Sequence, residues 1–139
     1  MIVMTKQQYQ EILEHSRNAL PNEACGLLGG RIENGVKYVE KVYLLRNIDE
    51  SPEHFSMNPK EQFAAVKDMR NNGWELLGNF HSHPATPSRP SEEDIRLAFN
   101  PKASYLILSL KEDTPVLKSF NISSGQATQE ELSIVGEEA

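Results

Sequence analysis

The stretch from Asn79 to Asp94 constrains the fold more than any other part of the chain. His81 and His83 stand two residues apart at the end of an apolar run, and Asp94 follows eleven residues after the second histidine. In an extended strand residues i and i+2 share a face, so both imidazoles can be directed at one point. Ser91 is a candidate N-cap and Asp94 the N3 residue of a following helix. The fold must therefore bring a helix start beside a strand end.

Two histidines and one aspartate form a three-ligand set that suits catalytic zinc, which keeps one position open for water. The ion lowers the pKa of water from about 15.7 to about 7, so hydroxide becomes available near neutral pH. Hydrolysis also needs a base, and Glu23 is the candidate because an unpaired carboxylate in a glycine-rich apolar strand is otherwise costly. The Ser91 hydroxyl is the candidate donor to the oxyanion that develops at the attacked carbonyl.

Composition favours one soluble domain over residues 1–139, with hydrophobic residues at 38% of the chain. The net charge of -6 argues against nucleic acid or a membrane surface as partner, because both reward clustered Lys and Arg. The single cysteine, Cys25, excludes an internal disulfide and a cysteine-rich zinc module, and we expect it to be buried. No signal peptide or membrane span is predicted, which favours a cytoplasmic protein.

Apolar periodicity predicts an α/β domain with a mixed sheet. Helices are expected over residues 6–19, 60–71 and 92–99, with Thr5, Asn58 and Ser91 as N-caps. Strands are expected over residues 2–4 at an edge, 23–32, 36–45, 74–82, 105–110 in the centre, 115–122, and 129–135 as a last edge strand. Residues 136–139 are expected to form a solvated tail.

Several side chains carry finer expectations. Phe63 should face inward with Val66 and Met69, and Leu77 should share the face of His81 and His83. His15 and His54 are expected to be solvated, with His54 lining a substrate groove as the alternative. Arg89 either steers a carboxylate or is solvated, and Gly29-Gly30 is expected to form a strand bulge or a close backbone approach.

A known signature is matched at every specified position, namely Glu23 and then the pattern H-x-H-x7-S-x2-D from His81 to Asp94. The chain thereby resembles the JAMM/MPN+ (Mov34/PAD-1) zinc metalloproteases. Its brevity makes it similar to the short prokaryotic Mec-type peptidases. The resemblance implies a cytidine-deaminase-like α/β/α sandwich with a mixed central sheet, formed as a single domain over residues 1–139.

The resemblance also implies roles and partners. By it His81, His83 and Asp94 bind Zn²⁺, Glu23 is the general acid/base, and Ser91 steadies the tetrahedral intermediate. The implied reaction is cleavage after the C-terminal Gly-Gly of a ubiquitin-like protein, with a small sulfur carrier as the expected substrate partner. The oligomeric state is left open between monomer and homodimer.

Other interpretations of the same residues remain. An isolated His-x-His pair can be two hydrogen-bonded histidines, Ser91 and Asp94 can serve only the helix start, and Glu23 can pair with a lysine. The alternative function is a non-catalytic MPN-type scaffold for protein interaction. A zinc nucleoside deaminase in its usual form is excluded, because the chain lacks the Pro-Cys-x-x-Cys ligand pair.

Overall fold

The computed structural model describes residues 1–136, so the predicted tail lies outside the described residues apart from Gly136. The elements follow in the order β1 (Ile2–Thr5), α1 (Lys6–Ala19), β2 (Cys25–Glu33), β3 (Val36–Leu45), α2 (Pro59–Asn71), β4 (Glu75–His83), α3 (Glu92–Leu97), β5 (Ser104–Ser109), β6 (Val116–Ser123), β7 (Gln126–Glu130) and β8 (Leu132–Val135). All three predicted helices form, although α3 ends earlier than expected. Within residues 1–136 no helix combines the length and apolarity needed to cross a membrane.

Within residues 1–136, eight strands form one mixed sheet in the order β7-β6-β5-β4-β2-β3-β1-β8. β1 runs parallel to β3 and β8, and β4 runs parallel to β5, while the other neighbours are antiparallel. The turn at Asn34 and Gly35, both with positive φ, joins β2 to β3 as a tight hairpin. The predicted mixed α/β class is therefore confirmed, whereas the specific likeness to cytidine deaminase stays a prediction.

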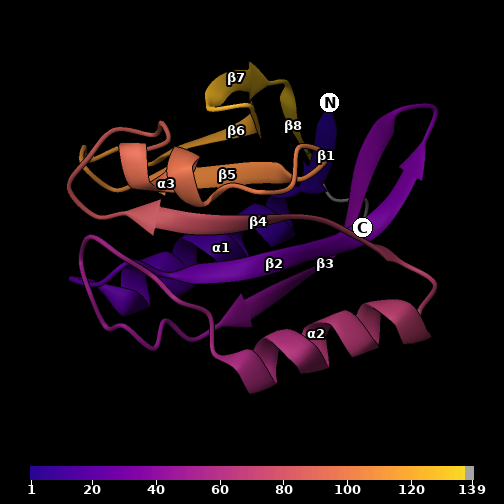
Figure 1. Cartoon of the computed structure of the whole chain (residues 1–139), viewed down its shortest axis with the longest axis horizontal. Coiled ribbons are helices and arrows are strands. Elements are labelled where there is room, and N and C mark those ends of the chain that lie inside the picture. The colour runs from indigo at the N-terminus through magenta and orange to yellow at the C-terminus, as the bar shows by residue number, and fades with distance from the viewer. Residues whose placement is uncertain (137–139) are drawn as a thin grey trace.

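The helices cover both faces of the sheet, with α1 behind it and α2 and α3 in front in Figure 1. On the α1 face, Ile12 and Leu13 pack with Leu28 and Phe80 in the main core. On the other face the packing of α2 centres on Ala65 and Met69, and α3 rests on a smaller cluster around Ile107. β4 lies in the middle of this arrangement, between β2 and β5.

The expectation for the sheet edges was wrong. β1 is an inner strand between β3 and β8, and the single strand expected over 129–135 is two strands, β7 and β8, at opposite ends of the strand order. Only Glu131 separates them, so the sheet must curl until its edges approach each other. Accordingly the N–H of Ile2 donates to the Glu131 carbonyl at 3.0 Å.

The expectation for Leu77 was also wrong, because a β-bulge interrupts the alternation of β4. Leu28 pairs with Gly78 but Gly29 pairs with Leu76, which leaves Leu77 without an opposite residue. Leu77 therefore turns into the α1 core with Phe80. The Lys37 ammonium donates to the Leu77 carbonyl at 3.1 Å. The predicted irregularity at Gly29-Gly30 is confirmed, since the register of β2 with β3 shifts between these glycines.

Phe63 was expected to face inward from α2, but its side chain is 73% exposed. The buried residues of α2 are Ala65 and Met69, one helical turn apart. Phe63 precedes Ala65 by two positions, which is about 200° around a helix, so it points away from the sheet.

Candidate metal centre

β4 places the two histidines at its carboxyl end. His81 pairs with Cys25 on one side and Ile107 on the other, so the strand is held from both flanks. His81 and His83 are only 3% and 4% exposed and share one face of the strand. Ser82 points to the opposite face, where its hydroxyl accepts from the N–H of Ala24 at 2.8 Å. Two imidazoles therefore emerge together from the rigid centre of the sheet.

The loop after β4 returns Asp94 to the histidines through the start of α3. The Ser91 hydroxyl accepts from the Asp94 N–H at 3.0 Å, and the Ser91 N–H donates to the Asp94 carboxylate at 2.9 Å. This is a capping box, as the sequence predicted at the helix start. The loop itself is fastened to β5, because Ser88 donates to the Ile107 carbonyl and Ser109 to the Thr86 carbonyl, both at 2.6 Å.

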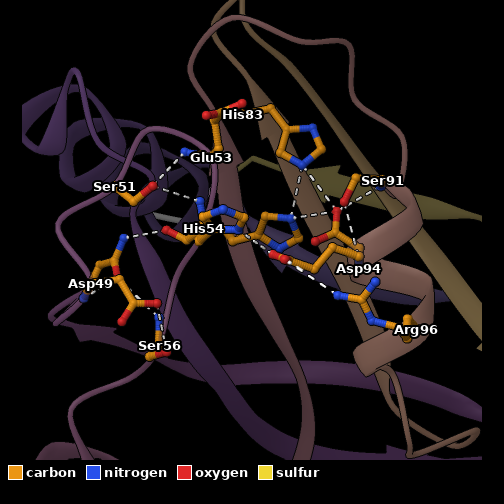
Figure 2. Close-up of polar contacts among 12 residues, drawn as sticks. Asp49, Ser51, Glu53, His54, Ser56, His83, Ser91, Asp94 and Arg96 are labelled. Carbon is orange, nitrogen blue, oxygen red and sulfur yellow. Dashed lines mark hydrogen bonds and ion pairs between the residues drawn. The ribbon is translucent and has the colours of Figure 1, made fainter.

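Three side-chain atoms converge in front of β4, as Figure 2 shows around His83 and Asp94. The Nε2 atoms of His81 and His83 are 3.1 Å apart, and the Asp94 Oδ2 lies 3.1 Å and 3.2 Å from them. In a tetrahedral zinc site with bonds of about 2.0–2.1 Å, ligand atoms are separated by roughly 3.3 Å. The donor set and its spacing therefore fit a metal ion, which agrees with the predicted ligand residues.

Each histidine is oriented by a different contact. The His83 Nδ1 lies 2.9 Å from the Pro87 carbonyl, which can only accept, so this nitrogen carries a proton. In the metal-free protein Nε2 can donate to Asp94, and when an ion is bound the proton on Nδ1 leaves the Nε2 lone pair for the ion. The buried His81 Nδ1 has no hydrogen-bond partner within residues 1–136. The His81 ring instead stacks on Phe55, with centroids 4.7 Å apart and planes 23° apart. The sequence indicated neither contact.

Hydrogen bonds control the charges of the centre. Burial opposes ionisation of Asp94, but hydrogen bonds from His81 and His83 outweigh it and hold the pKa of this carboxyl well below its usual range. Burial also disfavours the charged form of His83, yet the hydrogen bonds with Asp94 and the Pro87 carbonyl raise its pKa. The carboxylate is thus kept anionic, as a ligand must be.

Glu23 lies beside this triad, two residues before β2 begins, and is 5% exposed. Its main chain is fixed, because its N–H donates to the Ser51 carbonyl at 2.8 Å and its carbonyl accepts from the Asn47 amide at 3.0 Å. Burial raises the pKa of Glu23 to about 8, against the attraction of His83. Within the described residues its carboxylate has no hydrogen-bond partner, so it is available to a water molecule or substrate.

The remaining predicted side chains have mixed outcomes. Ser91 is exposed, and its hydroxyl accepts from Asp94 while its own proton has no acceptor within residues 1–136. Cys25 is buried as expected, and burial raises its pKa to about 12. His15 is not solvated, because its Nε2–H donates to the Cys25 and Leu45 carbonyls. His54 is exposed, and it pairs with Glu93 of α3 at 2.7 Å.

Two recesses flank the triad. One, of about 670 Å³, is reached by His83, Glu23, Ser91 and Arg89 together with several prolines, and we call it the proline pocket. The other, of about 410 Å³, is reached by His81 and Asp94, and we call it the apolar groove. Its apolar lining consists mainly of Leu27, Phe55, Met57, Leu97, Phe99 and Tyr105. A substrate peptide that passes over the triad would therefore contact both the proline pocket and the apolar groove.

Comparison with known proteins gives the family. Residues 5–123 match the model of prokaryotic homologs of the JAB domain. The chain is 29% identical to the CysO-cysteine peptidase of Mycobacterium tuberculosis, covering 97% of this chain and 92% of that protein. It is 35% identical to the desampylase of Pyrococcus furiosus, covering 68% of this chain and 71% of that protein.

Solved structures agree with this result. A Desulfitobacterium hafniense protein is 62% identical with a TM-score of 0.91, covering 99% of this chain and 94% of that one. A JAB1/MPN domain protein from Archaeoglobus fulgidus is 25% identical with a TM-score of 0.62, covering 97% of this chain and 99% of that one. The chain therefore belongs to the family of prokaryotic homologs of the JAB domain, and the resemblance found in its sequence is confirmed.

Proposed function

We propose that this chain is a zinc-dependent peptidase or isopeptidase that hydrolyses the bond after the C-terminal Gly-Gly of a ubiquitin-like protein, with a sulfur carrier as substrate. The observation that carries the proposal is the convergence of His81, His83 and Asp94 beside the unpaired carboxylate of Glu23. Two relatives named a CysO-cysteine peptidase and a desampylase support this class of substrate. We propose a single catalytic domain over residues 1–139, and the cytoplasmic location stays a prediction.

In this proposal His81, His83 and Asp94 hold the ion. Bound zinc supplies a Lewis acid that lowers the pKa of water to about 7. Glu23 then accepts a proton from the attacking water and passes it to the leaving amine. In the metal-free protein burial raises its pKa to about 8, and a cation held by the triad would lower this pKa toward the intermediate strength that a group acting as both base and acid needs.

Ser91 is the proposed donor to the developing oxyanion. Its hydroxyl already accepts from the Asp94 N–H, so the backbone of α3 fixes the position of the oxygen. The hydroxyl proton remains able to point toward the proline pocket, which Ser91 lines. A donor prearranged in this way stabilises negative charge that appears only in the transition state.

The test uses purified protein and a ubiquitin-like carrier extended past its C-terminal Gly-Gly, incubated with and without a chelator. The proposal predicts a product whose mass ends at the second glycine, formed only when the metal is present. A protein that binds the carrier but yields no product under any metal loading would instead be the interaction scaffold. Cleavage that continues undiminished after complete metal removal would contradict the proposed mechanism.

A further inference from the structure

In the proposed reaction the amine departs toward the proline pocket. Hydrolysis adds the oxygen of water to the glycine carbonyl carbon, breaks the C–N bond and places a proton on the departing nitrogen. Glu23, the proposed donor of this proton, lines the proline pocket together with His83 and Ser91, and it does not line the apolar groove. The other recess that Glu23 lines contains none of the three proposed ligand residues. Because a donor must lie within hydrogen-bond reach of the nitrogen, the leaving group belongs in the proline pocket.

This pocket is built to keep its shape. Proline fixes its own φ, so a wall of prolines has little freedom to rearrange. Five of the chain's 8 prolines line the pocket, namely Pro21, Pro52, Pro84, Pro87 and Pro90. The hydrogen bonds of Ser88 and Ser109 fasten the same loop to β5. A volume of about 670 Å³ lies within the usual range of small-molecule sites.

The charges on the pocket match the two ends of an amino acid. Arg31 and Arg96 pair with glutamates, whereas the Arg89 guanidinium, which lines the pocket, has no carboxylate partner within residues 1–136. A guanidinium binds a carboxylate through two parallel hydrogen bonds. The pocket's acidic side chains are Glu23 and Glu53, which suit the amine end of the leaving group.

We propose that Arg89 is the residue that recognises the leaving group, by binding the free α-carboxylate of a single amino acid that is joined through its α-amine to the terminal glycine and lies in the proline pocket. The proposal rests on the proposed function and names the residue that makes its site prefer such a leaving group. A lysine joined through its side-chain amine within a protein presents no α-carboxylate to Arg89. Cleavage of such an isopeptide would gain nothing from Arg89.

Three substrates on one carrier test the proposal: Gly-Gly-Ala with a free carboxylate, Gly-Gly-Ala carboxamide, and Gly-Gly joined to a lysine side chain of a blocked peptide. For the native protein we expect kcat/KM to be about tenfold higher for the carboxylate than for the carboxamide. Arg89→Gln should reduce kcat/KM for the carboxylate substrate to that for the carboxamide, and it should leave kcat/KM for the carboxamide and the lysine-linked substrate unchanged. Arg89→Lys should keep part of the preference for the carboxylate, because lysine keeps the positive charge but cannot form the two parallel hydrogen bonds of a guanidinium.

Arg70→Gln is the matched control, because it removes the same charge from the last turn of α2. It should leave all three values unchanged. Binding gives an independent readout: the metal-loaded Glu23→Gln variant, which should not cleave, is titrated with the carboxylate and carboxamide peptides by calorimetry. The carboxylate peptide should bind about tenfold more tightly, and adding Arg89→Gln should remove the difference.

Equal rates and affinities for carboxylate and carboxamide would overturn the inference while leaving the proposed function intact. So would an Arg89→Gln variant that slows all three substrates by the same factor. If the native protein cleaved none of the three, the proposed function would fail and the inference with it. The two failures are therefore distinguishable.

Discussion

His81 and His83 stand two residues apart on one strand, yet the protein orients them by different means. His83 is fixed by a hydrogen bond to the Pro87 carbonyl, four residues along the chain. His81 is fixed by the Phe55 ring, which comes from the connection between β3 and α2. A hydrogen bond sets both the tautomer and the ring direction, whereas stacking sets only the plane of the ring. His83 is thus oriented by a polar contact close in sequence, whereas His81 is oriented by an apolar contact with a loop that is distant in sequence.

The largest expected effect treats the two histidines alike. His81→Ala and His83→Ala each remove one of three proposed protein ligands, so bound zinc should fall from about one ion per chain to nearly none. Elemental analysis after dialysis against a competing chelator measures this. His15→Gln, which changes a histidine outside the triad, should keep the full content. Retention of one equivalent by either alanine variant would contradict the ligand assignment.

The next largest expected effect is on stability, because Glu23, which lies near His83, is a buried carboxyl group. Burial raises its pKa from 4.5 to about 8 in the folded protein. Below about pH 4.5 the carboxyl is protonated in both the folded and the unfolded protein, so its ionisation does not affect stability. As pH rises from about 5 to 8 the unfolded protein ionises first, and the free energy of unfolding of the wild type falls. Glu23→Gln removes that dependence. In metal-free protein the variant should gain about 2 kcal/mol relative to wild type between pH 5 and pH 8.

Urea denaturation of both metal-free proteins at the two pH values measures this difference. We expect less than the full pKa difference would give, because Glu23 lines a pocket that water can enter. A difference between variant and wild type that is the same at pH 5 and pH 8 would show that Glu23 titrates normally in the folded protein.

A smaller effect separates the two histidines. Phe55→Ala should weaken zinc binding about tenfold, because the His81 ring loses the contact that holds its plane. Pro87→Ala keeps the carbonyl that accepts from His83, so it should change the affinity about twofold or less. Titration against a chromophoric chelator measures both. If both variants lost zinc affinity by the same factor, the proposed difference in how His81 and His83 are oriented would be wrong.

The sequence predicted the parts of the centre whose geometry is local. The spacing of His81 and His83 on a strand, and the capping box of Ser91 and Asp94, follow from the periodicity of strands and the chemistry of helix starts. Glu23 was a candidate because a carboxylate in a glycine-rich apolar strand needs a reason, but its catalytic role was predicted from the resemblance to the metalloprotease signature. Its distance from the triad along the chain gave no indication of their proximity.

The features that the sequence missed depend on contacts between distant segments. Phe55 resembles any loop aromatic until the fold lays it on His81. Leu77 was assigned to the wrong face because a β-bulge breaks the alternation that the prediction assumed. Likewise, β7 and β8 were taken as one strand because nothing in residues 129–135 reveals that the curled sheet uses them at opposite edges.

The most direct test of the account compares wild type and Glu23→Gln for metal content and for cleavage of the extended carrier in the same preparation. Glu23 is proposed to move protons and not to bind the ion, so the variant should hold about one zinc ion per chain while releasing no detectable product. A variant that binds zinc and cleaves at the wild-type rate would contradict the central claim. It would show that the carboxylate beside the triad is not the base.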